Sequence, residues 1–176
     1  QGQAQSSPGL KLVVDQIERQ KLSVHARPNS DDPTRPNAAC KDCHDSHSFA
    51  RVPAEGPARV AYRLAVPEKC GACHEDQIDE YRESIHGTTV LGKHDPKGAV
   101  CADCHNPHGV DNTSNDAAKL SIVRACGNCH VENAASYTDT YHGQITRLGY
   151  TFTAKCFNCH GSHDIRAVDD PESMVH

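Results

Sequence analysis

The sequence predicts a mainly α-helical chain of short helices and extensive loops, with little or no β-structure and with tandem repeats. Segments 75–87 and 131–143 carry apolar or aromatic residues at helix-like intervals, whereas strand patterns are weak throughout. Only 36% of the 176 residues are apolar, 5% are aromatic, and tryptophan is absent, whereas about half of a typical globular chain is apolar. Because such a chain cannot bury enough surface to offset its conformational entropy, we expect a bound group to supply the missing core.

The cysteines identify that group. All ten fall into five Cys-x-x-Cys-His motifs, whose cysteines are Cys40 and Cys43, Cys70 and Cys73, Cys101 and Cys104, Cys126 and Cys129, and Cys156 and Cys159. This spacing is the attachment signature of c-type haem, in which both thiols bind the porphyrin and the next histidine binds the iron. The proximal ligands are then His44, His74, His105, His130 and His160. The sequence therefore predicts five covalently bound haem c groups and a small, haem-dominated fold.

Zinc sites and disulfides are the alternatives for paired cysteines. A zinc ribbon also uses Cys-x-x-Cys, but it does not need a histidine directly after the second cysteine. A disulfide framework predicts irregular spacing without linked histidines. Five repetitions of the full motif therefore favour haem.

The motifs are of two types. Three, which we call second-type motifs, are followed three residues later by another histidine, and they begin at Cys40, Cys101 and Cys156. The first-type motifs, at Cys70 and Cys126, precede the helix-like runs, which end in His86-Gly87 and His142-Gly143. We expect each glycine to close its helix.

The two types alternate in a repeat of about 55 residues that carries two haems. We expect an N-terminal extension (1–24), a partial repeat with one haem (25–69), a di-haem repeat with its linker (70–125), a second di-haem repeat (126–165) and a tail (166–176), all in one haem-packed domain. Residues 111–125 form the linker, and 111–116 are a polar loop.

Six histidines outside the motifs recur at matched positions and are candidate distal ligands: His25, His47, His86, His108, His142 and His163. His94 and His176 have no matched copy, so we do not include them. A histidine three residues after a proximal histidine lies on the same helix face, and so cannot reach the far side of the same porphyrin. His47, His108 and His163 should therefore serve other haems.

Two pairings are open. In the favoured one, His25, His86 and His142 serve the second-type motifs at Cys40, Cys101 and Cys156. His47 and His108 serve the first-type motifs at Cys70 and Cys126, which leaves His163 either structural or bound to a haem of another chain. In the alternative, His108 and His163 ligate backwards within their own repeats and His47 is spare.

Three segments resemble multihaem cytochromes of bacterial respiration, the cytochrome c3-like and doubled-motif class: Tyr81-Arg82-Glu83-Ser84-Ile85-His86-Gly87, the stretch from Cys101 to His108, and the stretch from Cys156 to Ile165. The resemblance covers residues 25–165 and implies bis-histidine haems that act as electron wires. Pentahaem nitrite reductases also carry five haems, but their catalytic haem uses Cys-x-x-Cys-Lys, which is absent here.

Bis-histidine iron has no open position for substrate, so we expect an electron-transfer protein rather than an enzyme. A subunit of an extracellular filament or of a membrane redox complex is an alternative. A reductase with one open haem is less favoured, and its open iron would be at Cys70/Cys73 or Cys126/Cys129, where the distal assignments are weakest.

The charge of the chain and the chemistry of haem attachment indicate its partners and its location. The formal charge of −5 argues against nucleic acid and favours basic docking surfaces on redox proteins. No apolar run is long enough to span a bilayer. Because c-type haem is attached outside the bacterial cytoplasm, we expect a periplasmic or extracellular protein whose signal peptide has been removed, with residues 1–7 as its mature N-terminus. Its donor and acceptor are expected to be redox proteins, with a membrane complex or copies of itself as further partners.

Overall fold

The structure is a computed structural model that describes residues 8–28, 32–34, 36–45, 47 and 52–176. The described chain consists of short helices joined by loops, and it contains no strand, which confirms the predicted fold class. The expected mature N-terminus, residues 1–7, lies outside the described residues. None of the described helices has the length and apolarity needed to cross a membrane.

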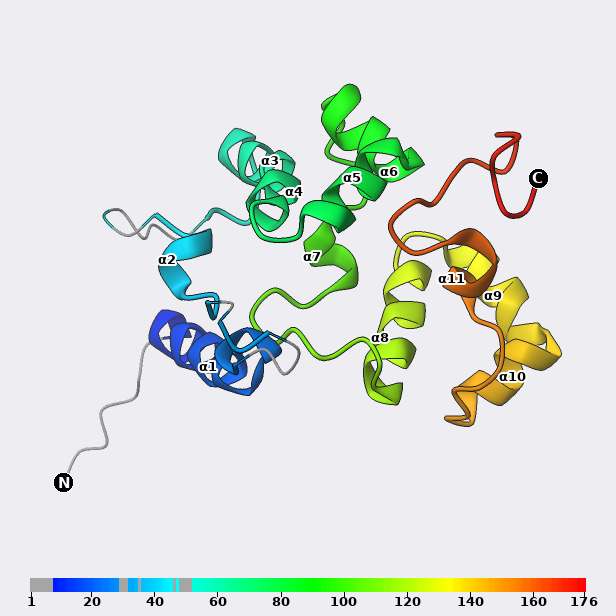
Figure 1. Ribbon diagram of the computed structural model, residues 1–176, viewed down its shortest axis with the longest axis horizontal. Coiled ribbons are helices and arrows are strands. Elements are labelled where there is room, and N and C mark those ends of the chain that lie inside the picture. The colour runs from blue at the N-terminus through cyan, green and yellow to red at the C-terminus, as the bar shows by residue number, and fades with distance from the viewer. Residues whose placement is uncertain (1–7, 29–31, 35, 46, 48–51) are drawn as a thin grey trace.

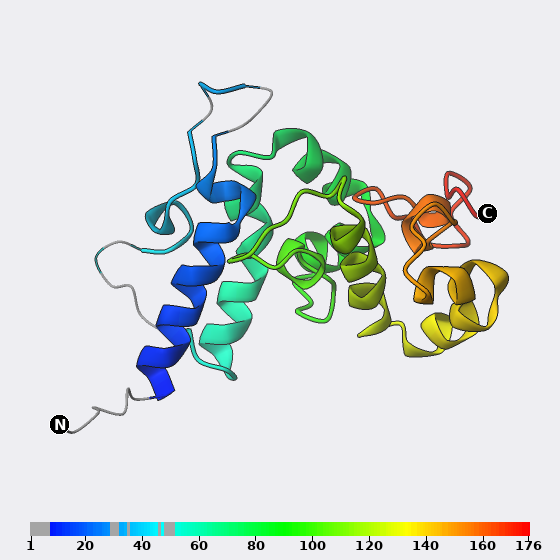
Figure 2. The same cartoon turned by 90° about the horizontal axis from the view of Figure 1, so that it is seen from below.

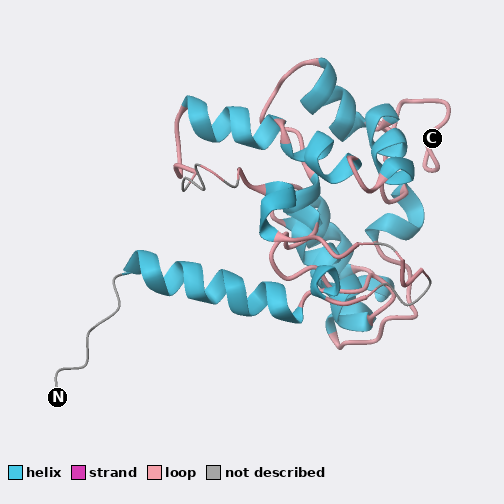
Figure 3. Ribbon diagram, turned by 60° about the vertical axis from the view of Figure 1, so that its left-hand side comes forward, coloured by secondary structure: helices cyan, strands magenta, loops and turns pink. Residues whose placement is uncertain are grey.

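The helices lie along an elongated molecule, with α1 and α2 near one end of the long axis and α9, α10 and α11 near the other (Figure 1, Figure 2). Helix α1 is the longest, and its N-terminal end projects from the rest of the chain (Figure 3). The elements are α1 (Pro8–Leu22), η1 (Val24–Ala26), α2 (Cys40–Cys43), α3 (Pro57–Leu64), α4 (Val66–Gly71), α5 (Glu75–Glu83), α6 (Ile85–Gly87), η2 (Thr88–Gly92), α7 (Cys101–Cys104), α8 (Asp116–Gly127), α9 (Val131–Asp139), α10 (Tyr141–Arg147) and α11 (Cys156–His160).

The polypeptide has little core of its own. Its accessible surface is 12523 Å², whereas a compact monomer of 19.1 kDa exposes about 8,400 Å². The main buried cluster is small and contains Ile78, Tyr81, Val90 and Val100. The chain therefore leaves open a large surface for a bound group to cover.

Two sequence expectations about local structure are corrected. The run 75–87 is not one helix, because α5 ends at Glu83 and Ser84 caps a new helix that contains His86 and Gly87. The polar loop expected over residues 111–116 is one residue shorter, because α8 begins at Asp116 and continues into the Cys126 motif.

Gly87 is the last residue of α6, which continues directly into η2, and Gly143 lies inside α10, so neither glycine closes the preceding helix. A Cβ added at Gly87 would lie 1.8 Å from the Tyr81 carbonyl oxygen, and one at Gly143 would lie 2.0 Å from that of Tyr137. Glycine is needed here because the backbones approach closely, not because a helix ends.

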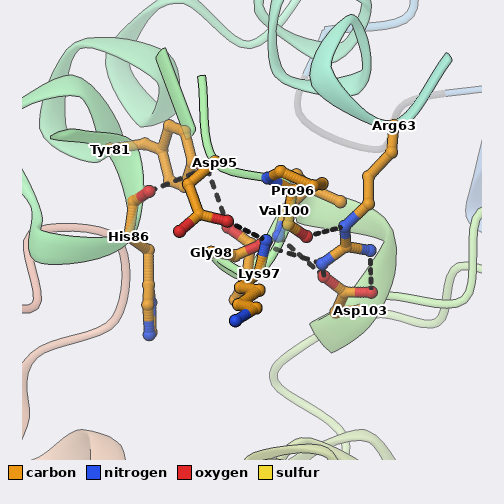
Figure 4. A network of polar contacts seen from close by, with 10 residues as sticks. Arg63, Tyr81, His86, Asp95, Pro96, Lys97, Gly98, Val100 and Asp103 are labelled. Carbon is orange, nitrogen blue, oxygen red and sulfur yellow. Dashed lines mark hydrogen bonds and ion pairs between the residues drawn. The ribbon is translucent and has the colours of Figure 1, made fainter. Parts of the chain in front are cut away.

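Arg63 of α3 ties the segment before the third motif to the helical core (Figure 4). Its guanidinium donates to the carbonyl oxygens of Pro96 and Gly98 at 2.6 and 2.8 Å. It also donates to both carboxylate oxygens of Asp103 at 2.8 and 2.7 Å. Burial alone would raise the pKa of Asp103, but hydrogen bonds from Arg63 and from the Val100 N–H outweigh it and lower the pKa overall. This network fixes the path of the chain into α7.

Removing the haem should unfold most of the chain, because the small apolar cluster cannot offset the entropy of ordering 176 residues. We expect the cysteine-free chain, with all ten cysteines changed to alanine, to give a poorly dispersed NMR spectrum and low helical circular dichroism. A well-dispersed spectrum from this haem-free chain would contradict the expectation.

Replacing Arg63 with methionine should lower the free energy of unfolding of the haem-loaded protein by about 1–3 kcal/mol, the usual effect of losing hydrogen bonds to a charged group. Chemical denaturation followed by circular dichroism measures it. Arg59→Met is the matched control, since Arg59 is exposed on the same helix, and it should change stability by less than about 0.5 kcal/mol. Equal losses in the two variants would show that the network has no special role.

Candidate haem-binding site

The chemistry-bearing residues are positioned by two recurrent local structures, one for each motif type. In the second-type motifs, an Asp or Asn stands directly before the second cysteine. Its side-chain oxygen accepts a hydrogen bond from the backbone N–H of the residue that stands directly before the first cysteine. Asp42 caps Ala39, Asp103 caps Val100 and Asn158 caps Lys155, at 2.7, 2.7 and 2.9 Å. This cap begins a one-turn helix that carries both cysteines on one short segment.

First-type motifs have glycine after the first cysteine instead. A Cβ added at Gly71 would lie 2.8 Å from Cγ1 of Ile78, and one at Gly127 would lie 3.1 Å from Cβ of Ala134. These glycines let α5 and α9 pack closely on the motifs that precede them. Both signals are visible in the sequence, as Gly or as Asp/Asn within the motif.

A third recurrent structure holds the histidines of the histidine-glycine pairs. The Ser84 hydroxyl accepts the Gly87 N–H at 2.9 Å, and the Thr140 hydroxyl accepts the Gly143 N–H at 3.1 Å. His86 and His142 therefore each lie in the first turn of a capped helix.

Two tyrosines link these turns to the next motif. The Tyr81 hydroxyl donates to the Ala99 carbonyl oxygen at 2.8 Å, and the Tyr137 hydroxyl donates to that of Ala154 at 2.9 Å. Figure 4 shows Tyr81 beside the hydrogen-bond network of Arg63 and Asp103, with the His86 ring pointing away from that network. Each tyrosine thus fixes a histidine-bearing helix relative to the second-type motif that follows.

In the part of the chain that the structure describes, four pairs of histidine rings face one another across similar gaps. The centroids are 6.1 Å apart for His25 and His74, 5.9 Å for His44 and His108, 6.2 Å for His86 and His130, and 6.2 Å for His105 and His163. Every pair joins one motif histidine to one of the matched histidines outside the motifs. The partners come from distant parts of the sequence, so the pairs link one expected repeat to another.

The gap fits one metal ion. Metal–imidazole bonds are about 2 Å long, and adding about 1 Å from each nitrogen to its ring centre places two ring centres about 6 Å apart across one ion. Zinc would need four protein ligands, whereas haem iron needs only two axial ones. Among the described residues no cluster of three or more His, Cys, Asp or Glu side chains has the arrangement of a metal site. The paired histidines therefore fit haem better than zinc.

The electrostatics favour neutral imidazoles, the form that binds a metal. Burial lowers the pKa of His25, His86, His105 and His108, and in each case the facing histidine lowers it further. A carboxylate oxygen of Glu80 lies 3.4 Å from Nδ1 of His163. This contact leaves Nε2 of His163 available to a metal and orients its ring.

Cysteines of motifs that follow one another in the sequence also lie close together in space. A hydrogen bond between thiols lowers the pKa of Cys70 to about 7 and raises that of Cys101. A corresponding bond lowers the pKa of Cys156 to about 6 and raises that of Cys126. The pKa of Cys43 is raised, mainly by burial and further by the charge of the neighbouring Cys70. Neighbouring motifs are therefore neighbours in space.

The ring pairs differ from the pairing favoured in the sequence analysis. His25 lies beside His74, not His44, and His86 lies beside His130, not His105. His108 lies beside His44 rather than His130. For His25 the reason is the docking of η1. Ser23 Oγ and the Val24 N–H donate to the Val110 carbonyl oxygen at 3.2 and 2.9 Å, which anchors η1 beside the segment that follows the third motif.

The backward alternative also differs in detail, since His108 and His163 face motifs one repeat earlier than their own. His74 and His130 each have a ring partner, although theirs were the weakest assignments. Among the described residues, His160 faces no histidine ring. His142 lies beside the ring of Tyr141 instead. His47 is exposed, and its backbone N–H donates to Asp45.

Comparison with known proteins agrees with the motif reading. A family model described as Doubled CXXCH motif matches residues 94–135, which include the third and fourth motifs. Over 97 residues the chain is 34% identical to "Multiheme cytochrome MtrA" of Shewanella baltica (strain OS185). The match covers 54% of this chain and 25% of that cytochrome. No solved structure gives a significant match.

Replacing Gly87 with alanine should move His86, because the new Cβ would lie 1.8 Å from the Tyr81 carbonyl oxygen. We expect a new high-spin signal from one haem in the ferric electron paramagnetic resonance spectrum. Gly92→Ala is the matched control, since nothing lies within 4 Å of a Cβ added at that nearby position. An unchanged spectrum in Gly87→Ala would show that this close approach does not position the histidine.

Proposed function

We propose that this chain, a multihaem c-type cytochrome with doubled CXXCH motifs, is an electron-transfer protein that holds five haem c groups in a row. The observation that carries the proposal is the set of four facing histidine pairs, each made of one motif histidine and one matched histidine. Bound haem c supplies one-electron exchange, and iron held by two imidazoles leaves no position for a substrate.

The residues of the chain have three tasks in this proposal. The ten motif cysteines attach the haems. His44, His74, His105 and His130 would each hold an iron through one imidazole nitrogen, and His108, His25, His163 and His86, respectively, would supply the second imidazole. His160 supplies the proximal nitrogen of the fifth haem.

The proximity of the sites follows from shared segments. His105 and His108 lie on one short segment but face different partners, so this segment belongs to two haem sites at once. The contact between Cys70 and Cys101 joins the second and third motifs in the same way, and the contact between Cys126 and Cys156 joins the fourth and fifth. Sites that share segments and cysteine contacts favour electron exchange along the chain.

Partners and location are part of the proposal. Attachment of c-type haem implies export, so we place the protein in the periplasm or outside the cell. The formal charge of −5 suits docking to basic surfaces on redox proteins, and association rates should fall as salt rises. The similarity to a multihaem cytochrome supports an electron carrier rather than an enzyme.

Replacing His25 with alanine tests the pairing on which this proposal depends. The iron held by His74 should lose its second imidazole, so that one haem in five becomes high-spin and binds carbon monoxide when reduced. His94→Asn is the control, because residue 94 has a φ of 54°, which asparagine tolerates. This control should leave every spectrum unchanged.

The same substitution in a chain that lacks the second haem shows whether His25 serves the motif of His74 or another motif. In a Cys70→Ala/Cys73→Ala chain, which lacks the haem held by His74, His25→Ala should have no further effect. If it creates a new high-spin haem there, His25 serves another motif and the pairing proposed above is wrong. Intact mass under denaturing conditions counts the haems, and five are expected in the unaltered chain.

A further inference from the structure

We propose that the buried ammonium of Lys155 raises the reduction potential of the haem at the fifth motif. The proposal rests on the proposed function, because it needs haem at that motif. Lys155 stands directly before Cys156 and is only 3% exposed. The corresponding residue before the third motif is Val100, which is equally buried and belongs to the apolar cluster. A buried cation thus replaces an apolar side chain at one of two matched positions.

The Lys155 ammonium makes contacts that Arg63 makes in the preceding repeat. The Arg63 guanidinium donates to two carbonyl oxygens in the turn before the third motif (Figure 4). The residues that correspond to these two acceptors, 55 positions later, are Thr151 and Thr153. The Lys155 ammonium donates to the carbonyl oxygens of both, with a distance of 2.7 Å to that of Thr153. A cation therefore holds the same turn in both repeats.

The two cations differ in their partners. Asp103 gives Arg63 a carboxylate, with two hydrogen bonds at 2.8 and 2.7 Å, so that their charges cancel. At the fifth motif the residue that corresponds to Asp103 is Asn158, which provides the same cap but carries no charge. Among the described residues, no carboxylate forms an ion pair with Lys155.

The charges of α8 that act on Lys155 cancel each other. Lys119 corresponds to Arg63, since each stands seven residues before a first-type motif, but the Lys119 ammonium lies 3.7 Å from the Asp116 carboxylate. Burial lowers the pKa of Lys155, and the charge of Lys119 lowers it further, whereas that of Asp116 raises it. An ordinary lysine pKa lies far above neutral pH, and the carbonyl oxygens accept hydrogen bonds from the charged form. One positive charge is therefore left in excess beside the fifth motif.

An excess cation beside a haem favours reduction. Reduction adds one electron to the iron and so removes one positive charge, and a fixed cation nearby stabilises the reduced form relative to the oxidised one. At the effective dielectric constant of a protein, a unit charge about 10 Å away changes such an equilibrium about tenfold. Lys155 should therefore make the haem at the fifth motif a stronger electron acceptor than a neutral residue at this position would.

The test is a redox titration of the haem-loaded protein, followed by visible spectroscopy. Lys155→Met should lower the equilibrium constant of one of the one-electron steps about tenfold, a shift of about 59 mV. Lys155→Arg keeps the charge and should keep most of the potential. Lys11→Met is the matched control, because it removes the same charge from an exposed position on α1, toward the other end of the molecule from α11 (Figure 1). It should leave that step in place.

A second pair of variants changes only the charge beside the cation. Asn158→Asp gives the fifth motif the carboxylate that the third one has, and should lower the same step as Lys155→Met does. Asp103→Asn leaves Arg63 without its carboxylate and should raise a different step. Both substitutions keep a side-chain oxygen for the cap. If Asn158→Asp moves no step, or if Lys155→Arg moves the step as far as Lys155→Met, the charge is not the cause and the proposal is wrong.

A chain with Cys156→Ala and Cys159→Ala, which lacks the fifth haem, identifies the step that moves. In this chain Lys155→Met should move no step, and a shift that persists would overturn the proposal, because the charge would then act on another haem.

These outcomes are separate from the fate of the proposed function. Five haems by mass, with reversible one-electron steps, would leave electron transfer standing even if no variant moves a step. Absence of haem from the unaltered chain would overturn both proposals.

Discussion

The structure depends on one constraint: pairs of imidazoles must face each other across the width of a single metal ion. Within the described residues four pairs meet this constraint, with centroid distances from 5.9 to 6.2 Å. Each pair joins residues that are far apart in sequence, so the repeats interlock. Because the buried apolar cluster is small, these crossings, together with the haems that the proposed function places between the rings, would replace the core that holds an ordinary domain together.

The local structure explains how short helices achieve such placement. Side-chain caps from Ser84 and Thr140 begin the helices that carry His86 and His142, and tyrosine hydroxyls fasten those helices to the following motif. The Arg63–Asp103 ion pair adds a link from α3 to the third motif. Backbone and side-chain hydrogen bonds thus do what apolar packing does in larger domains, namely fix the directions of the elements.

Much of this was predictable from the sequence, and the reasons are local. The motifs and the helical class follow from spacing and composition, and the matched offsets singled out the four histidines that face motif histidines, His25, His86, His108 and His163. The pairing did not follow, because it depends on how repeats pack on one another. Nothing near His25 in the sequence reveals that Ser23 and Val24 bind the carbonyl oxygen of Val110. The close approach of Gly87 to Tyr81 is likewise a property of the folded backbone.

The most direct test of the account is an experimental structure of the haem-loaded protein, by crystallography or cryo-electron microscopy, at a resolution that shows iron and imidazole. We expect an iron between the rings of His25 and His74, an iron between the rings of each of the three other pairs, and thioether bonds to all ten cysteines. Irons held by other combinations of histidines, or cysteines joined to zinc or to each other, would contradict it.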